Sequence, residues 1–417
     1  MSARRLPLYG WLTAEAISLL GTRVSMIAIP WLVLVTTGSP TRTGLVAAAE
    51  LTPLVIFKAT GGPLVDRVGP RRMAITADLL SMVAVGMIPL LHRADHLTFG
   101  VLLVLVAIGG GLRGPGDAAI GAMIPGLVES AEVPYERATG LASAIERGAT
   151  MIGAAIAGGL VATIGAANAV AVDAVSFGVC AVILMATTRG IAVGHRDPEP
   201  SDEARPTSYL GELRDGWRFL RGDVVLMSLC LMVAGTNLLD LAWSAVLLPV
   251  WARESGAGVG ALGLVFAVWG GASMVGSFIA AAYGTRLPRF WTYVVAYLVT
   301  GLPRFVLFAI GVPLWAILAM CVVGGCASGF LNPVLGAVEF ERIPPALVGR
   351  VTALSSALCW SLMPLGGVLG GVLVSGVGLD PALLVVGVCY FAATMAPTLM
   401  PHFREMDRAV RPDPVSV

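Results

Sequence analysis

Charged side chains set inside long hydrophobic segments are the residues of this chain best suited to do chemistry. Arg113 and Asp117 are four residues apart, a spacing that places both on one helix face, where they can form an ion pair. Glu146 is followed directly by Arg147, and Asp240 lies deep in a later hydrophobic segment. An ionisable group in hydrocarbon is costly, so it normally faces a polar cavity or a partner. The pattern therefore predicts either structural ion pairs or a site that handles protons or a polar ligand inside a membrane.

The first hydrophobic segment holds a further pair of charges. Glu15 and Arg23 are eight residues apart, about two helical turns, and therefore share a face. Over the whole chain, the hydrophobic segments hold more acids than bases, which leaves some carboxylates without a cation. Desolvation favours the protonated form of such a carboxyl group, which is the property that reversible proton transfer requires. Proton coupling is therefore predicted, with the proton gradient as the energy source.

Other charged residues of the hydrophobic segments have a simpler interpretation. Glu50, Lys58, Asp78 and Arg304 are assigned positions near the ends of their segments. A long charged side chain at such a position extends to the interface, which is called snorkelling. We therefore expect no special chemistry from these four residues.

Composition indicates where the charges must lie. Hydrophobic residues make up 57% of the 417 residues, charged residues 13%, and the mean hydropathy is +0.85. A water-soluble protein of this size needs more polar surface, so the chain is predicted to be an all-α integral membrane protein. The hydrophobic runs have the length of helices that cross a bilayer, about 20 residues, whereas strands of a membrane barrel need about ten. Twelve transmembrane helices are predicted, at residues 8–36, 43–64, 73–91, 98–125, 138–162, 167–188, 223–251, 259–283, 290–310, 314–338, 350–375 and 381–400.

Basic residues are distributed unevenly between the two sides of the predicted membrane. Most of the 27 lie in the termini and in the connections that follow even-numbered spans. By the positive-inside rule, both termini face the cytoplasm. The first hydrophobic run lacks a small-residue cleavage site, so we expect it to be retained as a span. The predicted location is a bacterial inner (cell) membrane, crossed many times.

A polar loop between the second and third predicted spans carries charges of both signs. Its pattern is Gly-x-x-x-Asp-Arg-x-Gly-x-Arg-Arg, formed by Gly62, Asp66, Arg67, Gly69, Arg71 and Arg72. This order resembles the loop signature of the major facilitator superfamily, in which Arg or Lys usually stands in place of Pro70. The resemblance implies a gating loop, in which Asp66 caps the start of span eleven at residues 349–352. Arg71 or Arg72 would reach an acid after span four such as Glu129. Simple turn chemistry combined with an orientation signal is the alternative.

The two halves of the chain repeat each other. Residues 137–145, Arg-Ala-Thr-Gly-Leu-Ala-Ser-Ala-Ile, return as Arg-Val-Thr-Ala-Leu-Ser-Ser-Ala-Leu at residues 350–358. We therefore predict two six-helix halves with pseudo-two-fold symmetry, as in many secondary carriers that work by alternating access. Channels and membrane enzymes can be duplicated as well. The predicted domains are an N-terminal bundle at 1–188, a cytoplasmic linker with an amphipathic helix at 189–222, a C-terminal bundle at 223–400 and a cytoplasmic tail at 401–417.

The resemblance to the superfamily extends to single residues within the spans. Arg113 resembles the span-four arginine that is linked to proton transfer, and Asp173 resembles a span-six landmark that is more often structural. Gly153 and Gly158 partly resemble the antiporter signature Gly-Pro-x-x-Gly-Gly, although Ala154 stands in place of Pro. Close packing of helices is the structural alternative for these glycines.

Tryptophan and asparagine side chains are candidates for the wall of a ligand cavity. Trp243, Trp269 and Trp360 lie deep in their spans, and Asn237 lies one turn before Asp240. Facing a central cavity, they would favour flat, apolar or cationic ligands through stacking and cation–π contact. Core packing is the alternative for each tryptophan. Apart from Asp240, buried charge is predicted for the first half only, because matching positions of the second half hold uncharged residues.

The linker between the halves contains a predicted helix at residues 208–221. Leu210, Leu213, Trp217 and Leu220 stand at helical spacing and form its apolar face. This pattern indicates an amphipathic helix on the inner membrane surface, and a solvated linker helix is the alternative. The segment also resembles the linker helix of bacterial drug and siderophore exporters in the superfamily.

Motifs of enzymes and metal sites do not occur in a suitable context. The chain shows no nucleotide-binding or hydrolase motif, and its cysteines and histidines lack metal-site spacing. We therefore expect neither an enzyme nor a cofactor. The preferred hypothesis is proton-coupled efflux, by antiport, of small amphipathic drugs or secondary metabolites, with the direction implied by the resemblance to exporters. A proton-coupled nutrient importer and a non-transporting receptor or lipid-handling protein are the alternatives. The expected partners are a small-molecule substrate, protons and the lipid bilayer, without nucleic acid, and the protein is expected to be a monomer.

Overall fold

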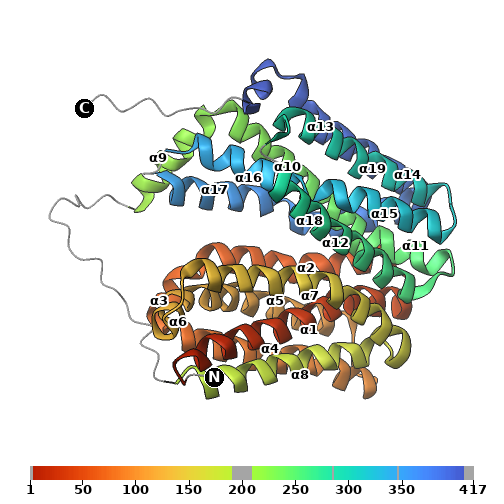
Figure 1. The fold of residues 1–417 in the computed structure, drawn as a ribbon. Coiled ribbons are helices and arrows are strands. Elements are labelled where there is room, and N and C mark those ends of the chain that lie inside the picture. The colour runs from red at the N-terminus through yellow and green to blue at the C-terminus, as the bar shows by residue number, and fades with distance from the viewer. Residues whose placement is uncertain (1–2, 190–208, 284–285, 345–346, 408–417) are drawn as a thin grey trace, which may run out of the picture. The chain divides into compact units, whose positions relative to one another are not determined.

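Helices account for nearly all of the structure (Figure 1). The computed structural model describes residues 3–189, 209–283, 286–344 and 347–407, and it contains no strand within these ranges. The helices of the first half are α1 (Leu6–Thr37), α2 (Pro40–Thr60), α3 (Gly62–Val68), α4 (Pro70–Arg93), α5 (Phe99–Ala122), α6 (Ile124–Ala131), α7 (Tyr135–Ile164) and α8 (Ala166–Thr187). The remaining helices are α9 (Tyr209–Gly222), α10 (Val224–Ala242), α11 (Leu248–Glu254), α12 (Gly258–Tyr283), α13 (Arg289–Thr300), α14 (Leu302–Ala309), α15 (Leu314–Ser328), α16 (Leu331–Arg342), α17 (Val348–Ser361), α18 (Met363–Val377) and α19 (Leu379–Met395).

The predicted all-α membrane fold is confirmed by the length and hydrophobicity of these helices. Among the described residues, 11 helical stretches are long and apolar enough to cross a membrane. The remaining predicted span corresponds to α2, whose 21 residues include Arg42, Glu50 and Lys58 and are therefore less hydrophobic. Because α2 packs along α5, its polar side chains can be sheltered by protein rather than by lipid. The twelve predicted spans are thus accounted for by 11 hydrophobic stretches and α2.

Two spans of the second half are interrupted where charged residues lie. Gly301 separates α13 from α14, and Pro303, which lacks a backbone N–H, follows in the first turn of α14. Arg304 therefore lies next to irregular backbone. In the same half, α10 passes into a π-helical turn at Trp243–Leu247 directly after the turn that carries Asp240. Such single π-turns are frequent at functional sites.

The chain forms two compact units, which are described separately. Unit 1 contains residues 1–197 together with residues 244–267 and 367–375, and unit 2 contains residues 198–243, 268–366 and 376–417. Unit 1 thus joins the helices α1 to α8 with α11 and parts of α12 and α18. The domain limits at residues 188, 222 and 400 stay a prediction.

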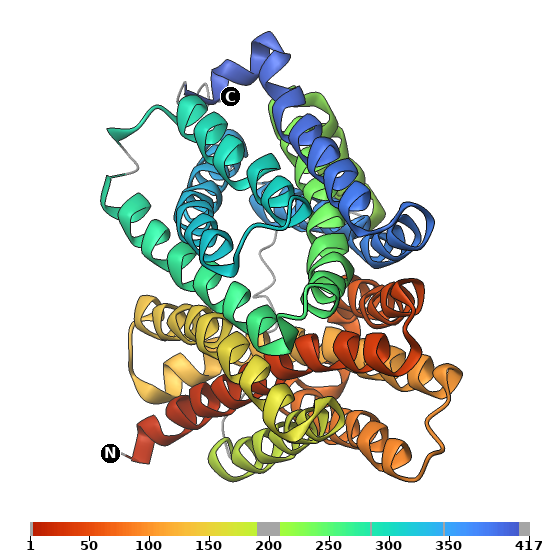
Figure 2. The same cartoon turned by 90° about the vertical axis from the view of Figure 1, so that its right-hand side faces the viewer.

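Close backbone contacts at glycines hold the helices of unit 1 together. Figure 2 shows the helices from the side that lies on the right in Figure 1. A Cβ atom on Gly44 would lie 1.9 Å from the carbonyl oxygen of Gly367, and one on Gly158 would lie 2.8 Å from the Cα atom of Gly263. A Cβ on Gly153 would lie 2.9 Å from the side chain of Arg23. Close packing, the structural interpretation of the span-five glycines, is therefore confirmed at these positions.

Unit 2 is built from α10 on α17, α14 on α19 and α13 on α15, with α9 against α17. Leu220 of α9 is completely buried and packs with Leu226 and Val351. The prediction that Leu220 faces the membrane is therefore wrong, because α9 places this side chain on α10 and α17 of its own unit. Trp217 is 42% exposed, and the side chains of Leu210 and Leu213 lie outside the described part of the chain.

Candidate functional site

Arg113 is the centre of a charged cluster inside unit 1. It lies on α5 among glycines that let α2 approach closely. A Cβ on Gly110 would lie 2.0 Å from the carbonyl oxygen of Glu50, and one on Gly114 would lie 2.7 Å from the backbone nitrogen of Lys58. The missing side chains thus allow α2 to lie directly on α5, which brings Glu50 to the level of Arg113.

Glu50, Arg113 and Asp173 line one small internal cavity together with Ser25 and Ser81. The lining residues come from α1, α2, α4, α5 and α8. The volume open to the centre of a water molecule is about 20 Å³, which is enough for about one water. A base and two acids therefore share a polar space that has room for one water.

The carboxyl groups of Glu50, Asp78 and Asp173 all interact electrostatically with the Arg113 guanidinium. Asp78 is 6% exposed and Glu50 lines the internal cavity. The snorkelling prediction for Glu50 and Asp78 is therefore wrong. Glu50 lies in the middle of α2, and α4 buries Asp78 against its neighbours, so neither side chain reaches an interface.

Asp173 is held by hydroxyl groups as well as by the cluster. Ser25 Oγ of α1 donates a hydrogen bond to Asp173 Oδ2. Ser176 Oγ donates to the backbone carbonyl of Asp173 at 2.8 Å. With 2% exposure and these partners, Asp173 is a buried hydrogen-bonding group that links α8 to α1, as its structural interpretation requires.

A second group of acids lies near this cluster, on α1, α5 and α7. The Glu15 carboxylate is close enough to those of Glu146 and Asp117 to be repelled by both. Arg23 interacts electrostatically with Glu146 and Arg113. The structure therefore brings most of the predicted coupling residues of the first half into one region of unit 1.

The predicted ion pair between Arg113 and Asp117 is absent from the described part of the structure. Arg113 faces the internal cavity, whereas the side chain of Asp117 is exposed. The acids of neighbouring helices are the electrostatic partners of Arg113 instead. Glu146 and Arg147 are both exposed on α7. The buried charges and the accessible charges of unit 1 thus form adjacent groups.

The polar loop forms the short helix α3 and the start of α4. Gly69, between them, has φ +87°, a backbone conformation that residues other than glycine rarely adopt. Arg71 donates from Nε to Thr188 Oγ1 at 2.9 Å and from Nη2 to the Met185 carbonyl at 3.1 Å. Arg71 is therefore engaged at the end of α8 and not with Glu129, because the last turn of α8 offers free acceptors.

The other residues of the loop leave its gating role open. The exposed members are Gly62, Asp66, Arg67 and Arg72. The predicted partner of Asp66 is the start of α17, which belongs to unit 2. Capping of that helix by Asp66 stays a prediction.

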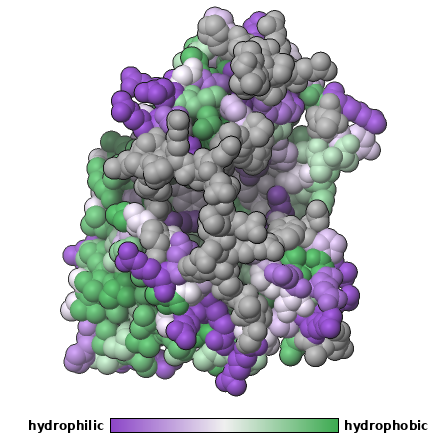
Figure 3. Space-filling model, turned by 90° about the vertical axis from the view of Figure 1, so that its left-hand side faces the viewer, coloured by the Kyte–Doolittle hydropathy of each residue, from purple (hydrophilic) through white to green (hydrophobic). Residues whose placement is uncertain are grey.

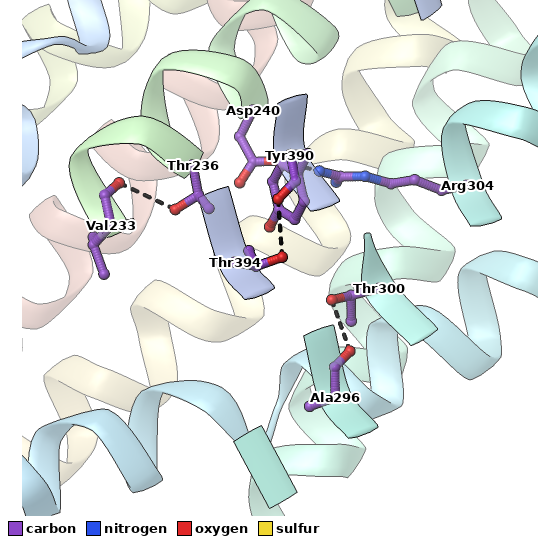
Figure 4. Close-up of polar contacts among 8 residues, drawn as sticks. All are labelled: Val233, Thr236, Asp240, Ala296, Thr300, Arg304, Tyr390 and Thr394. Atoms are coloured by element: carbon purple, nitrogen blue, oxygen red, sulfur yellow. Dashed lines mark hydrogen bonds and ion pairs between the residues drawn. The ribbon is translucent and has the colours of Figure 1, made fainter. Parts of the chain in front are cut away.

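Unit 2 contains an ion pair between Asp240 of α10 and the buried Arg304 of α14 (Figure 4). Arg304 is 5% exposed, whereas the side chain of Asp240 is 41% exposed. The snorkelling prediction for Arg304 is wrong, and so is the prediction that Asp240 alone brings buried charge to the second half. The interruption at Gly301 turns the first residues of α14 towards the interior, which the length of the span does not reveal.

Four aromatic rings surround the guanidinium of Arg304. Its Cζ atom lies 4.5 to 5.4 Å from the ring centroids, and these rings belong to Trp243, Trp269, Phe305 and Tyr390. Trp243 and Trp269 also contact each other, with centroids 6.4 Å apart. Both tryptophans pack on Arg304, which agrees with core packing, the alternative to lining a ligand cavity, because the buried cation attracts the ring faces. A role of either ring in ligand binding stays a prediction.

The remaining cavity candidates lie close to this pair. Asn237 Nδ2 donates a hydrogen bond to the Cys359 carbonyl at 2.9 Å, which ties α10 to α17. Trp360, the next residue, is half-buried. The described residues contain no group of three or more His, Cys, Asp or Glu side chains that could hold a metal ion. A role of Asn237 and Trp360 in ligand binding stays a prediction.

Known proteins with similar sequences and folds are membrane transporters. The family model of the Major Facilitator Superfamily matches residues 11–365. The chain is 30% identical to the multidrug efflux pump Tap of Mycobacterium tuberculosis, over 99% of this chain and 97% of that protein. It is 21% identical to macrolide efflux protein A of Streptococcus pyogenes, over 97% and 98% of the two chains. Its fold is similar to that of a variant of the nucleoside transporter NupG, with a TM-score of 0.75, 14% identity and coverage of 96% and 99%.

These similarities agree with features that the sequence and the structure show separately. The family match begins in α1 and ends in α18, so it includes both halves of the chain. It also includes the polar loop and the cluster around Arg113. The chain belongs to the major facilitator superfamily, a family of multi-pass membrane transporters.

Proposed function

We propose that the protein exports small amphipathic compounds from a bacterial cell and takes up protons in exchange. The direction is supported by the relatives that are named efflux proteins, one of them 30% identical over almost the whole chain. The observation that carries proton coupling is the cluster in which Glu50, Arg113 and Asp173 share a cavity with room for about one water. Alternating access of the two predicted six-helix halves would move the substrate.

Glu50 is our first candidate for the proton-carrying acid. Among the acids of the cavity, Asp173 already accepts hydrogen bonds from the hydroxyls of Ser25 and Ser176. Glu50 lines the same cavity as Arg113, and in the described residues no serine hydroxyl donates a hydrogen bond to it. Protonation of Glu50 would weaken its attraction to Arg113 and so change the contact between α2 and α5. A proton can shift a conformational equilibrium only through such a difference in interaction energy.

The accessible acids favour a cationic amphipathic substrate. Glu15 lies within electrostatic range of Asp117 and of Glu146, with Arg23 as a cation near Glu146. One Glu15 oxygen is buried and has no hydrogen-bond partner in the described residues. A substrate amine would relieve the repulsion among these carboxylates, and its binding would compete with protons. This competition is what exchange of a substrate for protons requires.

Transport by the purified protein in liposomes tests the proposal. An imposed pH gradient should drive movement of a cationic dye such as ethidium, and Glu50→Gln or Glu15→Gln should remove the dependence on the gradient. Glu129→Gln changes an exposed acid of the α6 turn and should transport like the wild type. Gradient-driven transport at the normal rate by both cluster variants would remove these acids from the mechanism. Gradient-driven uptake of a nutrient without efflux of any dye would favour an importer.

Both termini are proposed to lie in the cytoplasm of a bacterial cell, in agreement with the distribution of basic residues. A cysteine placed at residue 5 would then react with a membrane-impermeant maleimide only in inverted vesicles. Labelling in intact spheroplasts would reverse the proposed orientation.

A further inference from the structure

Helix α9 is fixed to unit 2 along one face. A Cβ on Gly216 would lie 3.1 Å from Leu354 Cδ1, and Leu220 is completely buried between α10 and α17. Figure 1 shows α9 beside α17 at the end of the unit. The opposite face of α9 therefore has a defined direction, away from the core of unit 2.

The joint between α9 and the following span is also fixed. Asp223 Oδ1 accepts hydrogen bonds from the backbone N–H groups of Val225 and Leu226 at 3.0 Å, which caps α10. Its other oxygen accepts from Arg342 Nε at 2.8 Å, and both side chains of this pair are largely buried. The hydrophobic span begins at Val224, two residues after α9 ends at Gly222. The last turns of α9 therefore lie at the level where the span enters the membrane.

The outward face of α9 forms a basic hollow, which we define by Arg214, Trp217, Arg218 and Arg221. With Gly222, these residues line a surface depression of about 370 Å³ that has no acidic residue in its lining. Trp217 and the three arginines are exposed. Asp215 lies 3.8 Å from Arg218 but belongs to the lining of the neighbouring depression. Figure 3 looks onto the end of the molecule that lies on the left in Figure 1 and shows hydrophilic side chains beside hydrophobic ones.

We propose that the basic hollow of α9 binds the headgroup of an anionic phospholipid from the cytoplasmic leaflet. Arginine guanidinium groups pair with phosphate oxygens through two parallel hydrogen bonds, and three of them converge on one depression. Tryptophan is the residue that favours the level of the lipid headgroups, where its ring is in a partly apolar environment. The hollow lies within two residues of the start of a membrane span, so lipid headgroups are the anions at its level. The helix thus contacts the bilayer through its basic face, while its apolar face holds it to the protein.

Counting bound lipids on the full-length protein by native mass spectrometry tests this proposal. The protein in detergent is titrated with phosphatidylglycerol or with phosphatidylcholine, which has no net charge, and the detergent is removed inside the mass spectrometer. Three arginines at a negatively charged surface are expected to give phosphatidylglycerol an advantage of roughly tenfold to a hundredfold in affinity. The triple variant Arg214→Gln, Arg218→Gln, Arg221→Gln should lose this advantage, and Trp217→Ala alone should weaken it by a few fold.

A matched control removes equal charge elsewhere. The triple variant Arg72→Gln, Arg286→Gln, Arg404→Gln changes three exposed arginines outside α9 and should keep the preference for phosphatidylglycerol. Equal affinity for the two lipids, equal loss in both triple variants, or displacement of the lipid by millimolar inorganic phosphate would each overturn the proposal. If the α9 triple variant does not fold, Trp217→Ala and Arg214→Gln, which change exposed side chains, decide the question by the same measurement.

Discussion

Replacement of Asp240 by asparagine removes the anion that faces the Arg304 guanidinium and leaves the volume of the side chain almost unchanged. Because Arg304 is 5% exposed, its charge cannot turn towards water. Removal of one partner of a buried ion pair costs about 3–5 kcal/mol, since the other charge stays buried. The Asp240 side chain is 41% exposed, so solvent already screens part of the attraction. We therefore expect the free energy of unfolding of unit 2 to fall by about 2–3 kcal/mol, slightly below that range.

The aromatic surroundings of Arg304 allow a second variant that separates charge from packing. Arg304→Met combined with Asp240→Asn leaves no charge buried, and the thioether packs well among the four rings. Removal of both partners of a buried ion pair is often close to neutral. The double variant should therefore recover most of the stability that the single variant loses. Asp380→Asn, at an exposed acid of the same unit, is the control for a change of charge alone.

Thermal unfolding of the purified protein in detergent measures these effects. For a unit of this size, 1 kcal/mol corresponds to about 2–4 °C, so Asp240→Asn should lower the melting temperature by about 4–12 °C. The control should melt within about 2 °C of the wild type, because surface substitutions usually change stability by about 0.5 kcal/mol or less. Our interpretation fails if Asp240→Asn has the melting temperature of the wild type, or if the melting temperature of the double variant is as low as that of Asp240→Asn.

Two further predictions concern packing and pH. Gly158→Val should lower the melting temperature by several degrees, because a Cβ atom at this position would lie 2.8 Å from the Gly263 backbone. Gly159→Ala is the control, since open space surrounds a Cβ atom there, and it should leave the melting temperature unchanged. Equal melting temperatures of the two variants would contradict this reasoning. Arg289 donates hydrogen bonds of 2.7 and 2.6 Å to Glu341 and thereby lowers the pKa of that carboxyl. The stabilisation is thus present above the ordinary glutamate pKa of 4.5 and is lost as the pH falls through the lowered value. Melting curves of Arg289→Gln should lack this acid-side loss, and an unchanged pH profile would show that the pair contributes nothing.

The fold could be predicted from the sequence because a lipid environment restricts the possibilities. Every backbone polar group in hydrocarbon must be bonded internally, so a run of about 20 hydrophobic residues becomes a helix. The span at α2, which is not among the 11 hydrophobic stretches, was predicted as well, since the loop signature after it fixes its end. What the pattern did not reveal was the break at Gly301, where one predicted span consists of α13 and α14.

The functional site was predicted only in part because burial depends on neighbouring helices. Arg113 was identified from its own depth and from the resemblance to the superfamily. Glu50 and Arg304 were assigned to the membrane edges, since depth was judged from the distance to the ends of a segment. Two signals were available: the glycines around Arg113, which allow a close neighbour, and the aromatic residues near Arg304, which favour a buried cation.

The contact between Gly44 and Gly367 has a consequence for how easily helices part. Two backbones that meet without side chains have nothing interlocked, so no rotamer must change before they separate. Little hydrocarbon is uncovered when they do, and the free-energy cost of exposing apolar surface scales with its area. The close fit of the two backbones therefore fixes how the helices align, while their separation needs little free energy.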